Sequence, residues 1–135
     1  MQQQTNSQPR TKDEAVRRLL ARGGLIDITT TGRKTGRPRR IEIVFHNVDG
    51  RIFISGMPRA DRKRAWIVNL EADPRMTVHL KGPLAADLPA TARVMTDPTE
   101  RRSVAEWIVR HAWPRMNLEA MAAYSPMIEV TLDDA

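Results

Sequence analysis

The sequence predicts an α+β domain, mainly β, in which six antiparallel strands form a small barrel with helices packed outside it. Apolar and polar residues alternate along short segments, turn signals separate these segments, and apolar residues at helical spacing lie before and between them. The 135 residues are 41% hydrophobic and 28% charged, which fits one ordinary globular domain. The expected order of elements is α-β-β-β-α-β-β-α-β.

The first helix and the strands after it follow from local patterns. Apolar residues recur at helical spacing over residues 13–22, and a Gly-Gly pair ends the helix. β-branched residues predict a strand at 25–31, and alternation predicts another at 39–45, so the two form a hairpin with a long basic loop. An Asp-Gly turn makes the strand at 51–55 antiparallel to the second.

After the third strand, the sequence predicts a helix followed by further strands. A helix is expected within residues 60–74, with Asp61 as its candidate N-cap and Pro74 at its end. His79 lies on the polar face of the next strand and is expected to be exposed. The last three strands are expected at residues 75–80, 90–95 and 127–132.

A late helix has an unusually complete start signal. Asp97 is expected to cap it, Pro98 takes the first helical position, and Glu100 closes a capping box. Arg101 and Arg102 are expected on the exposed face of this helix, and a second short helical piece follows before the last strand.

Composition excludes several classes of function. Residues 1–12 are expected to be a disordered polar tail before a single domain at 13–135, and their lack of an apolar region favours a cytoplasmic protein without a membrane span. The chain has no cysteine, and its three histidines show no metal-ligand spacing, so no metal site is expected. Redox chemistry would therefore require an organic cofactor or haem.

Positive charge is concentrated in two short segments. The net charge of +6 implies an anionic partner, and nine of the 22 cationic residues lie within 33–40 and 59–64. The segment TTTGRKTGRPRR, residues 29–40, carries five of them between two expected strands. Its glycines allow tight turns and its N–H groups can form an anion-binding concavity. The two clusters form either two walls of one site or two separate patches.

Three segments resemble motifs of one enzyme family. TTTGRKTGRPRR, DGRIFISG and AWIVNLEADPRMTVHL occur in the order and spacing of the deazaflavin-dependent nitroreductase family, within the flavin/deazaflavin oxidoreductases, and the resemblance covers about residues 25–132. It implies the FMN-binding split barrel, which is the pyridoxamine-phosphate-oxidase-like fold. It also implies coenzyme F420, a deazaflavin whose tail carries a phosphodiester and a polyglutamate.

The same resemblance implies the cofactor-binding residues. Lys34, Thr35 and Arg39 match the phosphate-binding positions, and other matching positions lie on the same loop, at the end of the third strand and on the next helix. These further candidates are Arg33, Gly36, Arg37, Ser55, Gly56, Met57, Trp66 and Asn69. Trp66 also lies on an apolar helical stripe, which is typical of a core residue. The chain departs from the family pattern at Glu42, Met57 and Arg64.

The C-terminal segment differs from the tyrosine-rich substrate pocket of the nitroreductases. It offers Met116, Leu118 and Met121, with Tyr124 as its one tyrosine. Methionine side chains are flexible and polarisable, so a pocket of this kind suits an apolar, adaptable substrate such as a quinone.

The leading hypothesis is an oxidoreductase in which reduced F420 gives a hydride to a quinone, an enone or a nitroaromatic, without a catalytic side chain. FMN is the alternative cofactor. A nucleic-acid-binding module is the alternative class, because TGRPRR contains the Gly-Arg-Pro core of minor-groove hooks. The flanking strands and the few aromatic residues argue against that class. A homodimer is expected, since split barrels of this type commonly pair.

Overall fold

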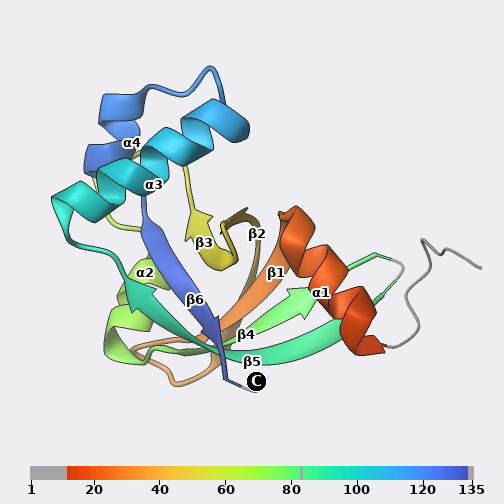
Figure 1. Ribbon diagram of the computed structural model, residues 1–135. Helices are drawn as coiled ribbons and strands as arrows, with labels where there is room; N and C mark the ends of the chain where they lie inside the picture. The colour runs from red at the N-terminus through yellow and green to blue at the C-terminus, as the bar shows by residue number, and fades with distance from the viewer. Residues whose placement is uncertain (1–11, 83, 134–135) are drawn as a thin grey trace, which may run out of the picture.

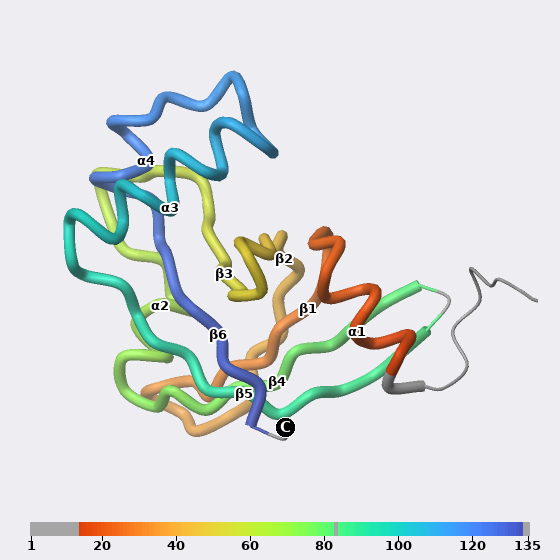
Figure 2. Tube along the Cα trace, viewed as in Figure 1, coloured from red at the N-terminus to blue at the C-terminus, as the bar shows by residue number. Residues whose placement is uncertain are grey.

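The computed structural model describes residues 12–82 and 84–133. The expected tail at 1–12 lies outside this part, except for Lys12, which begins the first helix. Figures 1 and 2 show the elements, which are α1 (Lys12–Arg22), β1 (Gly24–Thr31), β2 (Pro38–Val48), β3 (Arg51–Ser55), α2 (Ala65–Ala72), β4 (Arg75–Leu80), β5 (Ala86–Val94), α3 (Pro98–His111), α4 (Leu118–Tyr124) and β6 (Met127–Leu132).

The six strands form a closed antiparallel barrel in the order β1-β2-β3-β6-β5-β4, which confirms the predicted architecture. The barrel closes through a short seam in which β1 residues Asp27 to Thr29 pair with β4 residues His79 to Thr77. The bounds of β3, β4 and β6 agree with the prediction. Strand β5 begins at Ala86, four residues earlier than expected, because Leu80↔Ala86 pairing extends the hairpin with β4.

Two hydrophobic cores hold the domain together. The first fills the barrel, where Ile28, Ile54 and Ile128 are fully buried, and Trp66 and Leu70 of α2 belong to it. The second lies between the α3–α4 pair and the outer face of the barrel, and is described below as the cap core. Figure 1 shows α3 and α4 together at one end of the barrel, away from α1.

Strand β3 takes part in both cores because its neighbouring side chains point to opposite faces. Ile54 points into the barrel, whereas Phe53 packs in the cap core with Ile108 and Met121. Burying a side chain of this size contributes about 1.5–3 kcal/mol. The cap is therefore held mainly by apolar contacts.

The helix starts confirm part of the prediction and correct the rest. The Asp97 carboxylate accepts a hydrogen bond from the Glu100 N–H at 2.8 Å, and Pro98 begins α3, as predicted. The Glu100 carboxylate pairs with Arg93 at 2.6 Å and does not close the expected capping box. Asp61 does not cap α2, which begins four residues later with Arg64 at the N-cap and no side-chain cap. Asp61 instead pairs with Arg59 at 2.7 Å, so its carboxylate is already engaged.

On the outer face of the barrel, His79 is buried and not exposed as expected. It is 8% exposed because its ring lies between side chains of the two flanking strands. Its Nε2 lies 2.6 Å from the Thr29 hydroxyl, and its Nδ1 lies 2.8 Å from an Asp87 carboxylate oxygen. Single-strand alternation could not reveal this cover, since it comes from partners on other strands. No helix in residues 12–82 or 84–133 combines the length and apolarity that a bilayer span requires.

Candidate cofactor site

The basic loop between β1 and β2 is a closed turn with its own hydrogen bonds. The Gly32 N–H donates to the Arg37 carbonyl and the Gly36 N–H donates to the Gly32 carbonyl, both at 2.8 Å. Gly36 has a φ of 71°, a conformation that favours glycine. A Cβ at Gly32 would lie 2.9 Å from the Thr35 hydroxyl oxygen, so the turn leaves no room for one. The Thr35 oxygen accepts from the Arg37 N–H at 3.1 Å, which leaves its O–H free to donate.

Asn69 attaches this loop to α2. Its side-chain oxygen accepts from the backbone N–H of Arg33, and its side-chain nitrogen donates to the Thr30 hydroxyl, both at 3.1 Å. Asn69 is 7% exposed, so these hydrogen bonds are shielded from water. The residue predicted to contact the cofactor thus also fixes the position of the loop.

A cavity of about 590 Å³, called the loop pocket below, lies between this loop and α2. Of the residues predicted to bind cofactor, those that line it are Arg33, Lys34, Thr35, Arg39, Trp66 and Asn69. Gly36 and Arg37 lie on the same loop outside the lining.

Four cations of the loop have no counter-charge in the described part of the chain. Arg33, Lys34, Arg37 and Arg39 are exposed, and their side chains make no hydrogen bond or ion pair within residues 12–82 and 84–133. Arg40, by contrast, donates to Asp27 at 2.9 Å. The loop pocket therefore presents free guanidinium and ammonium donors, which suit a phosphate or carboxylate group.

The end of β3 lies next to the tryptophan wall of this pocket. Gly56 donates its N–H to the Pro126 carbonyl at 3.0 Å, and a Cβ at Gly56 would lie 2.8 Å from Pro126 Cγ and 3.8 Å from Trp66 Cζ2. Ser55 is 1% exposed, and its hydroxyl donates to the Gly56 carbonyl at 3.4 Å, so it faces the interior. Trp66 is 8% exposed and combines both expected roles, since it packs in the barrel core and lines the loop pocket.

A second hollow, called the methionine pocket, follows directly after Gly56. It has a volume of about 600 Å³ and is lined by Met57, Trp113, Pro114, Arg115 and Met116. Met57 is 56% exposed. This pocket places Met57, a predicted cofactor contact, beside Met116, a predicted substrate contact.

Only Met116 of the predicted substrate residues lies in the methionine pocket. Met121 has no exposed surface and packs in the cap core, so its placement corrects the expectation that it contacts a substrate. Tyr124 is 53% exposed and borders a different cavity, and Leu118 packs against the cap core. Met121 differs from the expectation because the register of α4 turns its side chain toward the cap core.

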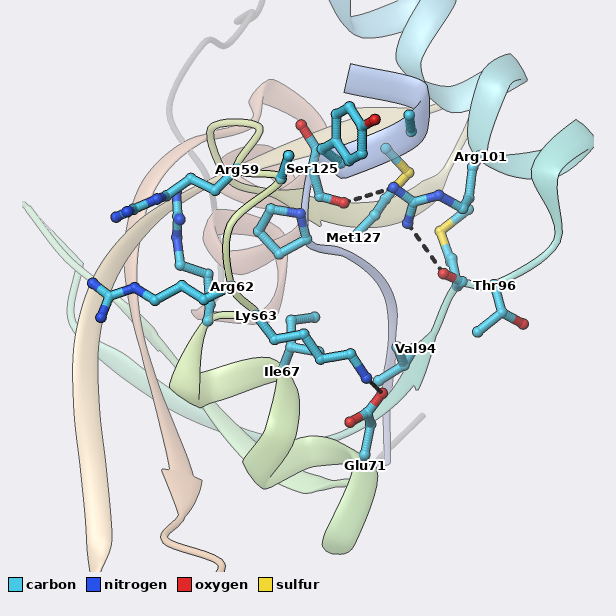
Figure 3. A pocket seen from close by; sticks show the side chains of 16 residues that line it. Arg59, Arg62, Lys63, Ile67, Glu71, Val94, Thr96, Arg101, Ser125 and Met127 are labelled. Carbon is cyan, nitrogen blue, oxygen red and sulfur yellow. Dashed lines mark hydrogen bonds and ion pairs between the residues drawn. The ribbon is translucent and has the colours of Figure 1, made fainter. Parts of the chain in front are cut away.

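The second basic cluster forms a separate patch. Arg59, Arg62, Lys63 and Arg64 line a third cavity of about 480 Å³, called the arginine pocket (Figure 3). The first turn of α2 separates it from the loop pocket, because Arg64 and Ile67 line the arginine pocket whereas Ala65 and Trp66 line the loop pocket. The two clusters are two patches and not two walls of one cavity.

Arg101 also lines the arginine pocket and is not exposed as predicted. Its guanidinium donates to three backbone carbonyls, those of Met95 at 3.1 Å, Ala122 at 2.9 Å and Ser125 at 2.7 Å. Burial lowers the pKa of this guanidinium. Arg102 is exposed, as expected, and pairs with Glu119. The sequence pattern could not predict the burial of Arg101, because its three carbonyl partners come from separate segments of the chain.

His46 is a titratable residue that the sequence analysis did not single out. It is 4% exposed on β2, and its Nε2 has no hydrogen-bond partner among the described residues. Its ring meets those of Trp113 and Trp107 edge-on, with centroid distances of 5.0 and 6.3 Å. Burial lowers the pKa of His46 to about 4. Within residues 12–82 and 84–133, no group of three or more His, Cys, Asp or Glu side chains could hold a metal ion.

The six-stranded barrel carries a cationic glycine loop beside a tryptophan wall, an arrangement that suits a ligand with an anionic tail and a flat ring. Comparison with family models makes the assignment specific. The chain belongs to the F420H(2)-dependent quinone reductase family, whose model matches residues 1–131. Membership confirms F420 as the cofactor and identifies the chain as an F420-dependent reductase.

Solved structures share the fold. An F420-H2 dependent reductase matches with a TM-score of 0.58 and 22% identity over 80% of this chain and 94% of its own. A structure described as a domain-swapped dimer matches with a TM-score of 0.57 and 22% identity over 88% and 96%. A conserved hypothetical protein from Mycobacterium tuberculosis matches with a TM-score of 0.70 and 15% identity over 97% and 86%. These matches confirm the split-barrel fold.

Proposed function

We propose that this protein transfers a hydride from reduced F420 to an electron-poor organic substrate, with quinones as the main class and enones and nitroaromatics as further members. The observation that carries the proposal is the order of the two pockets along the chain. Trp66 of the loop pocket lies beside Gly56, and the next residue, Met57, lines the methionine pocket. A cofactor held by its tail in the first pocket can thus meet a substrate in the second.

The loop pocket suits the anionic tail of F420. Lys34, Thr35 and Arg39 would hold the phosphodiester, since they supply an ammonium, a free hydroxyl and a guanidinium. Arg33 and Arg37 on the same loop would meet the glutamate carboxylates. Gly56 and Trp66 would adjoin the deazaflavin ring, which supplies the hydride when the reduced cofactor is bound.

The methionine pocket suits an apolar acceptor. Met57, Met116 and Trp113 offer polarisable contacts that adapt to different ring systems. Among the described residues that line this pocket, Arg115 is the one ionisable group, and a guanidinium does not give up its proton. The hydride carries two electrons and one proton to a quinone, and a proton from water completes the hydroquinone. The protein contributes binding and orientation.

A homodimer is part of this proposal. Leu25, Met57 and Tyr124 are large apolar side chains that are 53–56% exposed, and burying them against a second copy would remove them from water. A fold relative is described as a domain-swapped dimer. The second copy would cover the exposed rim of the methionine pocket at Met57.

A cofactor titration tests the proposal. Lys34→Ala and Arg39→Ala should each weaken F420 binding by about ten- to a hundredfold, because each removes a charge-assisted hydrogen bond worth about 1.5–3 kcal/mol. Fold stability should hardly change, since an exposed cation contributes about 0–1 kcal/mol. FMN should bind more weakly than F420 to the unmodified protein.

Arg110→Ala is the matched control for these two variants. Arg110 is exposed in the last turn of α3 and lines none of the three pockets, so its loss removes one positive charge away from the proposed sites. Equal weakening by all three substitutions would show that overall charge attracts the cofactor and that the loop has no special geometry. Failure of F420H2 to reduce menadione in the presence of the protein would contradict the substrate class.

A further inference from the structure

The arginine pocket is a built cavity that the proposed reaction does not use. Three separate chain segments meet around it: the β3–α2 connection, the β5–α3 junction and the α4–β6 junction. In Figure 3, Arg59 and Arg62 lie on one side of the cavity and Arg101 on the other. The Arg59 N–H donates to the Tyr124 carbonyl at 3.4 Å, which joins the first segment to the third.

Part of the positive charge in this pocket is neutralised and part is not. Arg59 pairs with Asp61 at 2.7 Å and Lys63 pairs with Glu71 at 2.8 Å. Arg62 makes no side-chain hydrogen bond among the described residues and acts on Asp61 only at longer range. The remaining charge can therefore attract an external anion.

Arg64 has a buried donor that no described residue uses. Its Nη2 donates to the Met57 carbonyl at 2.9 Å, whereas its Nη1 is buried without a hydrogen-bond partner in the described part of the chain. Ser125, which is 2% exposed and lines the same cavity, also has a hydroxyl oxygen without a partner. Buried donors without acceptors are uncommon in folded proteins and call for a ligand or water.

Arg101 adds a half-buried cation with no counter-ion. Its three hydrogen bonds all go to neutral backbone carbonyls, and no described carboxylate lies within ion-pair distance of it. A cation that is partly removed from water without an opposite charge is costly, and an anion in the cavity offsets that cost. Arg64, Ser125 and Arg101 thus point to the same kind of ligand.

The rest of the lining restricts the chemical class of the anion. Ile67, Val94 and Met127 form an apolar wall, and Tyr124 adds an aromatic ring. Lys63 already neutralises Glu71, so this apolar wall is the feature of the lining that defines the body of the ligand. We propose that the arginine pocket binds an organic monocarboxylate with an apolar body, at a site distinct from the F420 site.

Octanoate is the probe, and binding to the full chain is measured by calorimetry with and without saturating F420. Octanoate should bind in both conditions, and 1-octanol, which has the same chain without the charge, should bind at least tenfold more weakly. Arg64→Met should weaken octanoate binding by about tenfold or more, because it removes the buried donor and keeps the apolar stem. Arg62→Gln, which removes an exposed charge of the lining without touching a buried group, should also weaken octanoate binding.

The control variants are Lys34→Ala, which lies in the loop pocket, and Arg110→Ala. Both should leave octanoate affinity unchanged, and Arg64→Met should leave F420 affinity within about twofold. Loss of octanoate binding when F420 is present would place octanoate in the cofactor site and overturn the proposal. Equal weakening by Arg64→Met and Arg110→Ala, or tighter binding of inorganic phosphate than of octanoate, would also overturn it. None of these outcomes depends on the substrate that F420H2 reduces.

Discussion

Acidification should destabilise the protein through His46. In the folded state the ring is buried between Trp107 and Trp113, and burial lowers its pKa from 6.5 to about 4. The unfolded chain therefore binds a proton at pH values where the folded protein does not. Above pH 6.5 both states are neutral and the stability is complete, and as the pH falls toward about 4 that stability is lost.

The size of the effect follows from the two pKa values. One pKa unit corresponds to about 1.4 kcal/mol. The fall from 6.5 to about 4 therefore corresponds to a loss of about 3 kcal/mol in unfolding free energy on full acidification. That is a substantial fraction of the roughly 5–15 kcal/mol by which native domains are stable. The loss should be felt first in the cap, because His46 packs against two tryptophans that border the cap core.

Urea unfolding at pH 7.5, 6, 5 and 4.5 measures this loss. His46→Leu is the comparison, since leucine fills the apolar site without titrating and removes the unpartnered Nε2. The difference between the two proteins in unfolding free energy should change by about 2–3 kcal/mol across this range. The contributions of the other titrating groups are the same in both proteins and cancel in this difference. Parallel pH profiles for the two proteins would refute the reasoning.

Two further predictions concern the site and the assembly. Asn69→Ala should lower the unfolding free energy by about 1–3 kcal/mol and weaken F420 binding in a fluorescence titration, because the Arg33 N–H and the Thr30 hydroxyl lose their partner. Thr30→Val should lower the unfolding free energy by about 1 kcal/mol and leave F420 affinity nearly unchanged. Equal losses of F420 affinity in the two variants would contradict the role of Asn69 in holding the loop. Sedimentation equilibrium at micromolar concentration should give about twice the mass of the 15.3 kDa chain, whereas a single-chain mass would exclude the homodimer.

The strands were predictable because their signals are local. An Asp-Gly turn, alternating apolar residues and a capped helix start each act over a few residues, and β3, β4 and β6 have the expected bounds. The closed basic turn at Gly32 and Gly36 follows from equally local chemistry. Six of the residues that line the loop pocket were predicted from the resemblance to the family: Arg33, Lys34, Thr35, Arg39, Trp66 and Asn69.

Residues whose environment comes from distant segments escaped prediction. Arg101 was expected in solvent, but carbonyls of Met95, Ala122 and Ser125 surround its guanidinium. His79 was expected to be exposed and is covered by neighbouring strands. The single-element patterns carry no information about such contacts, because these depend on how elements pack.

The separation of the barrel core from the cap core has an evolutionary consequence. Trp66 and the strands that carry the basic loop belong to the first core, whereas Trp113 and Met116 pack against the second. If the methionine pocket binds the acceptor as proposed, changes of shape in residues 98–124 alter which acceptor molecules fit without repacking Trp66. Under the same proposal, replacement of residues 98–124 during evolution changes the substrate while the cofactor stays the same. A protein engineer can transfer the same segment between relatives.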